Sequence, residues 1–366
     1  MGIIDSFKSV LRPLAHGVGG ETKVRIKPLA ELFPDAERTF VVPPETVDTP
    51  MLDSDDLAPG LYHHRGAQYT TPGMFVAVLH NVLFCPTNHV ILSREGVVVE
   101  ESICTIAKPK YLDSNALSVR GRVRIAEPST TFRSRWYNNY YHTLIDHLPR
   151  LYGLLQYRGK EELPDILVKD TLTPVEEFVL DKVGQSNAPI TELKGGVLYE
   201  LDTCIFVSGM CRRDMSYLPA EYVNWFRNQV MPDRSSAANR RIIVSRSKAG
   251  SRRMANEQEV ARTLSNEGFE IFHLEDLSPR AQMELFYDAE AVVGMHGAGL
   301  ANLVYSPHAR VVECFSSKHF LPNYYLLAKS MGLPYAKVHG SEEWREDNTE
   351  ISVSKILTAL ENLDVS

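Results

Sequence analysis

A turn of small residues follows an apolar run in the last third of the chain. Residues 291–295 have the composition of a buried strand, His296-Gly297-Ala298-Gly299 comes next, and a helix is expected from Ala298. Glycines let a backbone approach a ligand closely, and the amides at a helix N-terminus attract anions. Such turns also occur where glycines serve only close packing. The imidazole of His296, which can donate to a phosphate, favours an anion site.

Two arginines fall on the same edge of the predicted sheet. Arg246 follows a β-rich run at residues 241–245, and Arg253 enters the helix expected after it. Because the carboxyl ends of parallel strands meet at one edge of a sheet, we expect both guanidinium groups beside His296. Arginine offers fixed pairs of donors that suit a diphosphate without a metal ion. The alternative is a solvated basic loop.

One carboxylate, that of Glu313, lies within an apolar run at residues 311–315. Burial of a carboxylate is costly unless the group is paired. An acid near the end of such a strand can accept hydrogen bonds from the hydroxyls of a ribose. A buried salt bridge is the alternative.

A histidine and a carboxylate share one face of a predicted helix in the first half of the chain. His142 and Asp146 are four residues apart, so one can orient the other as a general base. Aromatic residues at 136–141 are candidates for a wall on which a sugar stacks, although aromatics at a helix start also form core. His147 is rotated away, so a His-Asp-His metal site is not expected.

Asp53-Ser54-Asp55 has the spacing of an Asp-x-Asp metal motif. Metal-binding carboxylates of this kind end an apolar strand, whereas these lie in a predicted loop. We interpret them as solvated acids and expect no metal site in this protein.

The elements that must position these residues form a regular pattern after residue 240. Short β-rich runs alternate with helical stretches, which predicts right-handed βαβ units and a parallel sheet covered on both faces. We therefore expect a Rossmann-like domain at residues 241–345. Its strands are expected at residues 241–245, 270–274, 291–295, 310–315 and 335–338.

The first 230 residues predict a second α/β domain. It carries an additional β-rich segment, with strands expected at residues 75–79, 88–92 and 96–99. Residues 231–240 lack periodicity and read as a linker. Residues 346–366 contain an amphipathic helix that we expect to cross back to the first domain.

Composition limits the kinds of partner. The 366 residues carry a net charge of −7, which gives no support for a nucleic-acid partner. The five cysteines have no Cys-x-x-Cys spacing, which disfavours disulfide frameworks and zinc sites. No apolar run approaches the length of a transmembrane helix. Residues 1–15 carry an apolar stripe that predicts either a docked helix or a helix at a membrane surface.

The chain resembles glycosyltransferase family 61, including bacterial members described as capsular polysaccharide biosynthesis proteins. The resemblance extends over residues 136–340, and its features occur in a specific order. They are Asn138, His142, Asp146, Leu148, Pro149 and Arg150, then Ser245 and Arg246, then Arg253, Asn256 and Glu257, then the run from His296 to Asn302, and Glu313.

The resemblance implies a GT-B fold, in which two Rossmann-like domains face a cleft, and inverting hexosyl or pentosyl transfer from a nucleotide sugar. The donor is expected to be UDP-linked, and no metal or other cofactor is expected. The N-terminal domain would bind a glycan or lipid-linked saccharide acceptor, with His142 or Asp146 as the base. The donor-binding residues would be Arg246, Arg253, His296, Gly297, Ala298, Gly299, Asn302 and Glu313.

Two other functions stay open at this point. One is a nucleotide-binding regulatory module of the same fold without turnover, which a fold cannot distinguish from an enzyme. The other, less favoured, is a metal-dependent hydrolase that uses His142, Asp146 and Asp53. We expect a cytoplasmic protein. If residues 1–15 form the membrane-surface helix rather than the docked one, the protein contacts the inner face of the membrane peripherally.

Overall fold

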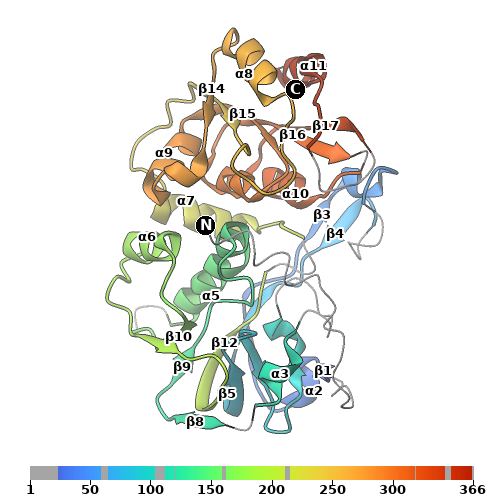
Figure 1. Cartoon of the computed structure of the whole chain (residues 1–366). Helices are drawn as coiled ribbons and strands as arrows, with labels where there is room; N and C mark the ends of the chain where they lie inside the picture. The colour runs from blue at the N-terminus through green and yellow to red at the C-terminus, as the bar shows by residue number, and fades with distance from the viewer. Residues whose placement is uncertain are drawn as a thin grey trace.

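The computed structural model describes residues 24–58, 65–103, 112–119, 121–158, 162–210, 215–317, 319–342 and 348–364. They form two large β-sheets, one in each half of the chain, with helices between and outside the sheets (Figure 1). The predicted α/β class is confirmed. The amphipathic segment expected at residues 1–15 lies outside the described residues. Within the described part of the chain, no helix is both long and apolar enough to cross a bilayer.

The C-terminal sheet consists of five parallel strands in the order β14-β13-β15-β16-β17. Because β14 follows β13 in the sequence but β15 lies on the other side of β13, the chain changes direction across the sheet beside β13. Ligands of open parallel sheets bind at such a switch point, beyond the carboxyl ends of the strands. The strands are β13 (Arg240–Val244), β14 (Phe269–Phe272), β15 (Ala289–Met295), β16 (Arg310–Ser317) and β17 (Tyr335–Glu342).

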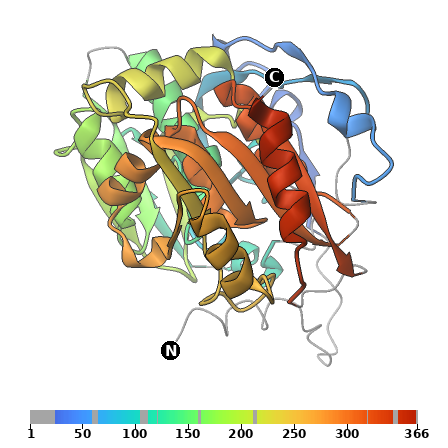
Figure 2. The same ribbon diagram turned by 90° about the horizontal axis from the view of Figure 1, so that it is seen from above.

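Alternate residues of these strands enter two different cores, as expected for a sheet covered on both faces. Val293 of β15 shares a core with α8 (Glu257–Ser265) and α11 (Val353–Asp364), whereas its neighbour Val292 shares one with α9 and α10. Figure 2 shows α8 and α11 side by side across the outer face of the sheet. The opposite face carries α9 (Pro279–Tyr287), the 3₁₀ helix η6 (Ala298–Tyr305) and α10 (Asn323–Met331), with the short helix η5 (Leu274–Asp276) before α9.

Helix α11 stays on its own sheet. Its buried residues Ile356 and Leu360 pack with Val312 of β16 and Val338 of β17. The expected return of this helix to the N-terminal domain is therefore wrong, because its apolar face is already buried against the C-terminal sheet.

The N-terminal sheet has ten strands and mixed directions. Its longest pairing is antiparallel, between β5 and β12, whereas β9, β10 and β11 run parallel to one another. Short helices α2 (Leu29–Leu32), η2 (Glu100–Ser102) and α3 (Ser114–Leu117) lie beside it. The strands are β1 (Ile26–Lys27), β2 (Arg38–Val42), β5 (Met74–Cys85), β6 (Val90–Leu92), β7 (Val98–Val99), β8 (Arg122–Ile125), β9 (Ser129–Thr130), β10 (Asp165–Lys169), β11 (Ile190–Leu193) and β12 (Leu198–Val207).

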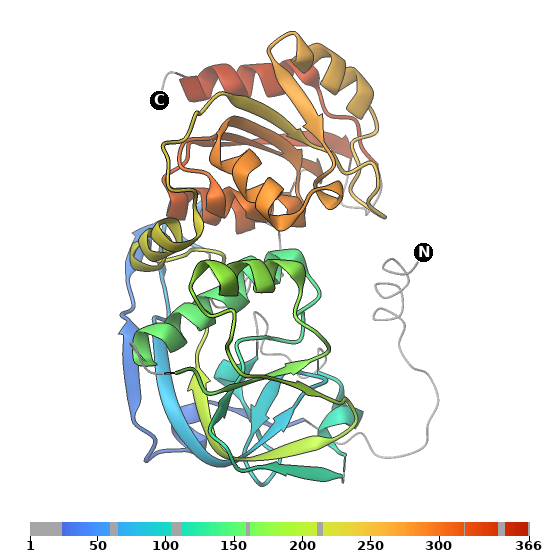
Figure 3. The same ribbon diagram turned by 90° about the vertical axis from the view of Figure 1, so that its left-hand side faces the viewer.

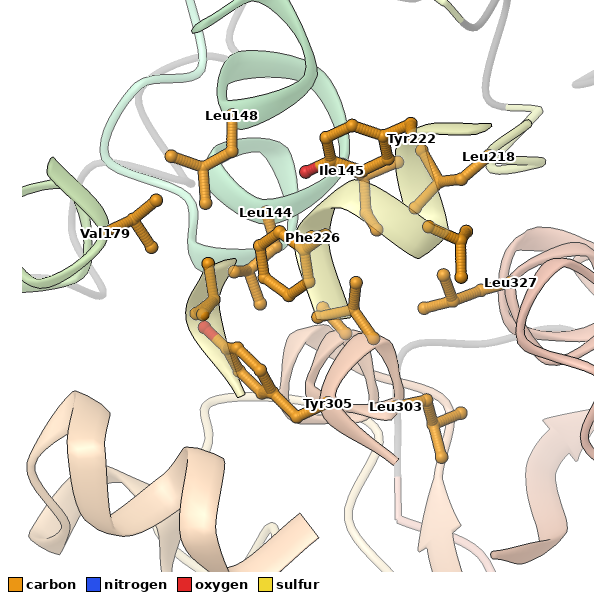
Figure 4. Packing of buried hydrophobic residues seen from close by; sticks show 14 of the residues in the cluster. Leu144, Ile145, Leu148, Val179, Leu218, Tyr222, Phe226, Leu303, Tyr305 and Leu327 are labelled. Carbon is orange, nitrogen blue, oxygen red and sulfur yellow. The ribbon is translucent and has the colours of Figure 1, made fainter. Parts of the chain in front are cut away.

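Helices of the N-terminal half lie between the two sheets (Figures 1 and 3). Their apolar side chains form one core with residues of the C-terminal half: Tyr222 and Phe226 of α7 pack with Tyr305 of η6 (Figure 4). Burial of each such aromatic side chain contributes roughly 1.5–3 kcal/mol. Residues 231–239 then lead from α7 to β13. These helices are α4 (Tyr140–His142), the π-helical turn η4 (Thr143–His147), α5 (Leu148–Arg158), α6 (Pro174–Lys182) and α7 (Ala220–Val230).

A buried ion pair fixes the segment that follows β9. Arg133 donates from Nε and Nη2 to the two oxygens of Glu176 in α6, at 2.9 and 2.6 Å, and both side chains are inaccessible to solvent. Arg133 also donates to the carbonyls of Lys169 and Thr171. Glu176 belongs to the capping box at the start of α6. The pair therefore ties the turn after β10 and the segment after β9 to one helix.

A hairpin of the N-terminal half reaches the edge of the C-terminal sheet. We call residues 46–58 and 65–70 the docking hairpin; it contains β3 (Thr46–Asp48), the 3₁₀ helix η1 (Pro50–Asp53) and β4 (Gln68–Thr70) (Figure 1). Backbone bonds join Asp56 and Ala58 to Phe320. The carboxylate of Asp56 accepts from Lys337 at 2.7 Å and from His339 at 2.9 Å. Asp56 thus ties the hairpin to β17.

Candidate functional site

The predicted anion-binding residues meet at the switch point of the C-terminal sheet. Arg246 follows the end of β13, and His296 follows the end of β15, the strand that pairs with β13. Both residues therefore lie beyond the carboxyl ends of adjacent parallel strands. The sequence pattern had predicted this edge for both.

The guanidinium of Arg246 is largely buried and has backbone partners. Nε donates to the carbonyl of Arg252 at 3.2 Å, and Nη2 donates to the carbonyl of Ser251 at 3.0 Å. Burial, with a smaller contribution from the charge of Arg252, lowers the pKa of Arg246 to about 10. Among the described residues, no carboxylate forms an ion pair with this guanidinium. The result is a positive charge that the fold holds in place without an ion-pair partner among these residues.

Gly297 makes room for that charge. A Cβ at this position would stand 1.9 Å from Nη1 and 2.7 Å from Cζ of Arg246, so the guanidinium lies directly on the backbone of the turn. The φ of Gly297 is 176°, an extended conformation that any residue adopts, so space rather than backbone freedom requires glycine here. At Gly299 a Cβ would come within 3.0 Å of Leu274 and 3.1 Å of Val244, which indicates close packing. Ala298 begins η6 and is partly buried.

His296 belongs to a buried polar group. Its Nδ1 lies 2.5 Å from Oε1 of Glu313, and the hydroxyl of Tyr335 donates to Oε2 of Glu313 at 2.6 Å. Burial raises the pKa of Glu313 well above its ordinary value. Burial, together with the charges of Arg252 and Arg246, lowers the pKa of His296. In a histidine–carboxyl pair without net charge, one proton lies between Nδ1 and the carboxyl oxygen. Whether that proton is on Glu313 or on Nδ1, Nε2 of the imidazole carries a hydrogen, so His296 can act as a donor.

The expectation that Glu313 binds a ribose does not agree with this geometry. Glu313 is completely buried, and each of its oxygens is within hydrogen-bond distance of a protein group. The alternative of a buried pair describes it better: Glu313 orients His296. Tyr335 gave no signal in the sequence, because a tyrosine near the start of an apolar strand is an ordinary core residue.

Arg253 also differs from its expected position. Its Nε donates to the side chain of Asn348 at 3.0 Å, and the residue is exposed. Its neighbour Arg252 has a φ of 55°, a left-handed conformation that is uncommon for arginine. The charge of Arg252 acts on His296, Glu313 and Tyr324. The second cation whose charge acts on His296 is therefore Arg252, and the Arg-Arg pair in the sequence was the only hint of it.

Asn302 joins the two halves of the chain. Its Oδ1 accepts from the hydroxyl of Tyr140 at 2.6 Å, and its Nδ2 donates to Gln282 and to the carbonyl of Gly299, each at 3.0 Å. Asn302 is completely buried. Its expected role as a donor ligand does not fit, since its polar atoms already bond to protein groups.

The predicted base lies on the opposite side of the interface. The π-helical turn at residues 143–147 follows His142, and such turns often occur at functional sites. Nδ1 of His142 lies 2.6 Å from Oδ2 of Asp146, with both side chains mostly buried. The predicted pairing is confirmed. His147 points elsewhere, with Nε2 2.9 Å from the hydroxyl of Ser134, as expected.

A row of rings leads from this pair to His296. Tyr141 packs on His142 with ring centroids 5.0 Å apart and on Tyr324 at 5.9 Å; Tyr324 packs on His296 at 5.2 Å. Asn323 donates to the hydroxyl of Tyr141 at 3.0 Å, which fixes this row. The structure thus brings the two predicted groups, from separate halves of the chain, to one interface.

The predicted solvated acids are exposed. Asp53 and Asp55 lie on the surface of the docking hairpin, while the adjacent Asp56 makes the contacts with Lys337 and His339. Among the residues that the structure describes, no three His, Cys, Asp or Glu side chains gather as a metal ion would require.

One comparison with known proteins finds a similarity over part of the chain. A family model described as Glycosyltransferase 61 matches residues 140–312, which include His142, Asp146, Arg246, Arg252 and His296. A search of curated proteins finds no match. Over these residues, which are less than half of the chain, the protein is similar to glycosyltransferase family 61.

Proposed function

We propose that this protein is an inverting glycosyltransferase that moves a hexosyl or pentosyl group from a nucleotide sugar, expected to be UDP-linked, to a glycan or lipid-linked acceptor in polysaccharide synthesis of the capsular type. The observation that supports it best is Arg246, a largely buried cation with carbonyl partners at the switch point of a parallel sheet. A buried charge without an acid beside it favours binding of an anion. The diphosphate of a nucleotide sugar is such an anion.

The same group suits the leaving diphosphate. Its negative charge grows as the bond from the anomeric carbon to the phosphate oxygen breaks, and fixed donors in a water-poor site stabilise it most. Arg246, Arg252 and Nε2–H of His296 supply those donors. We propose that they replace a divalent ion, so that transfer does not depend on metal.

His142 is the proposed base. Asp146 bonds its Nδ1, which directs the basic lone pair of a neutral imidazole to Nε2. Nε2 takes the proton of the acceptor hydroxyl while the acceptor oxygen bonds to the anomeric carbon and the diphosphate leaves. A single displacement of this kind inverts the anomeric configuration. Asp146 is then a positioning residue rather than the base.

A nucleotide panel in titration calorimetry tests the donor site. We expect UDP, or another nucleoside diphosphate in the panel, to bind the wild-type protein and to bind the Arg246→Gln variant about tenfold or more weakly, since a charge-assisted hydrogen bond is worth about 1.5–3 kcal/mol. Arg38→Gln, at an exposed position of β2, is the matched control. Absence of binding by every nucleoside diphosphate would overturn the assignment of this site.

The second candidate function is a regulatory module that binds a nucleotide without turnover. It shares the donor site and differs only in chemistry. Hydrolysis or transfer of a bound UDP-sugar that is lost in His142→Ala, with UDP affinity unchanged, supports the enzyme. Binding without any turnover across a broad set of acceptors supports the module.

A further inference from the structure

A second concentration of positive charge lies beside His142, at the carboxyl ends of the parallel strands of the N-terminal sheet. Arg135 is on the segment that follows β9, and Lys169 is the last residue of β10, which pairs with β9. By the rule that places ligands beyond the carboxyl ends of parallel strands, this edge is the counterpart of the edge that carries Arg246.

Trp136 contacts both Arg135 and the proposed base. The guanidinium carbon of Arg135 lies 5.8 Å from the centre of the indole. The imidazole of His142 is stacked on the same indole, with centroids 6.1 Å apart and planes inclined by 20°. Trp136 is partly exposed, so it offers apolar ring surface close to a cation and to a base.

The charge of Arg135 is not neutralised by the acids near it. The guanidinium donates to the amide oxygen of Asn88 at 3.2 Å, and burial lowers the pKa of Arg135. The nearby carboxylate of Asp113 accepts instead from the backbone amides of Asn115 and Ala116. Within the described ranges, no carboxylate forms an ion pair with Arg135.

The positive charge of Lys169 is likewise not paired with an acid among the residues that the structure describes. Its ammonium lies over the ring of Tyr137, 5.7 Å from the centroid, and forms no ion pair within the described ranges. The adjacent Asp170 accepts from the hydroxyl of Tyr137 at 2.5 Å. His89, almost completely buried against Tyr137, has an Nδ1 without a hydrogen-bond partner among the described residues. These groups leave donors unmatched around Tyr137, the residue after Trp136.

We infer that this edge binds an acceptor that carries an anionic group, a phosphate or a carboxylate, about one sugar ring away from the hydroxyl that reacts. The sugar ring packs against the exposed part of Trp136, its hydroxyl faces His142, and its anionic group is bound by Arg135, with Lys169 at the end of the neighbouring strand. The inference rests on the proposed function for the direction of transfer, but the binding site itself does not depend on it. It narrows the acceptor class from glycans in general to sugar phosphates, including lipid-linked ones, and uronic acids.

The test follows the environment of Trp136 by ¹⁹F NMR of the full-length protein labelled with 5-fluorotryptophan. The Trp136→Phe variant assigns the signal among the three tryptophans. The probes are glucose 1-phosphate, glucuronate and glucose, each titrated with saturating UDP present so that the donor site is occupied. If UDP does not bind, the titration is made in the Arg246→Gln variant, which separates failure of the donor site from failure of this inference.

We expect glucose 1-phosphate, glucuronate or both to shift the Trp136 signal at concentrations about tenfold lower than glucose does, as one charge-assisted bond predicts. In Arg135→Gln, the charged probe should shift the signal only at concentrations close to those needed for glucose. In Arg38→Gln, the difference between the charged probe and glucose should remain. A response to glucose 1-phosphate alone identifies a phosphate, and a response to glucuronate alone identifies a uronic acid. Equal responses to all three probes, no response, or an unchanged response in Arg135→Gln would overturn the inference.

Discussion

Gly297→Ala separates the function of the Arg246 turn from its stability. The added methyl would stand 1.9 Å from Nη1 of Arg246, whereas carbon contacts are normal at about 3.5 Å, so the guanidinium must move by about 1.6 Å. That displacement breaks or stretches its bonds to the carbonyls of Ser251 and Arg252. The backbone of residue 297 is extended, so alanine adds no conformational strain.

The expected magnitude follows from the displaced charge. A misplacement of about 1 Å costs up to about 100-fold in catalysis, and loss of a hydrogen bond to a charged group costs about 1.5–3 kcal/mol. We therefore expect Gly297→Ala to weaken nucleoside diphosphate binding by about 10- to 100-fold in calorimetry. The melting temperature should stay near that of the wild type, since replacing an extended glycine also restricts the unfolded chain.

Gly121→Ala is the matched control, because a Cβ there meets nothing within 4 Å. The two variants should melt alike, and only Gly297→Ala should lose affinity. Wild-type affinity in Gly297→Ala would refute the placement of Arg246 at the diphosphate. A large fall in melting temperature would show instead that the glycine serves packing.

Four further predictions concern the charges described above. Arg252→Gln should weaken nucleoside diphosphate binding by about tenfold in calorimetry, whereas Arg253→Gln should leave it nearly unchanged. A larger loss in Arg253→Gln than in Arg252→Gln would instead support Arg253 as the diphosphate ligand. Transfer activity in excess EDTA should equal activity with magnesium or manganese, and loss that manganese restores would direct attention to Asp53 and Asp55. Glu176→Gln should lower the free energy of unfolding in urea by about 3–5 kcal/mol, because it leaves the buried charge of Arg133 without its partner; an effect below about 1 kcal/mol would contradict this. Burial raises the pKa of Asp56, but hydrogen bonds from Lys337 and Ser54 outweigh it and hold the pKa below its ordinary value. The pairing therefore stabilises the fold above pH of about 4, and this stability is lost as the pH falls further. Asp56→Asn should lower the free energy of unfolding in urea by about 1 kcal/mol at pH 7 and by progressively less below pH of about 4. Asp53→Asn, at an exposed position, is the control.

The C-terminal half was the more predictable part of the chain. Its strands are long enough for hydrophobic runs to stand out, and the alternation of strand and helix predicts the parallel sheet. The edge that carries Arg246 and His296 follows from that topology. In the N-terminal half, β9 has only two residues, Ser129 and Thr130, so its pairing with β10 had no periodic signal to reveal it.

Within the site, the sequence could not predict which way each side chain points. Arg252 and Arg253 are equivalent as sequence letters, yet the charge of Arg252 acts on His296 whereas Arg253 bonds to Asn348. Glu313 required a partner, but its identity depended on Tyr335, which comes from a different strand. The role of Asn302 likewise depended on Tyr140, a contact between residues 162 positions apart.

The docking hairpin changes how the two sheets can move relative to each other. The chain connects them covalently at residues 231–239, and the bonds of Asp56 and Ala58 to β17 and Phe320 connect them at a second place. A body attached at one flexible point can turn about three axes, whereas a body attached at two points can turn about only the line between them. The halves also share the core around Phe226 and Tyr305 and the bond of Tyr140 to Asn302, so these contacts must separate before either half can turn. Once they separate, and while the hairpin stays docked, the motion that is left is a rotation about that single line, and displacement grows with distance from it.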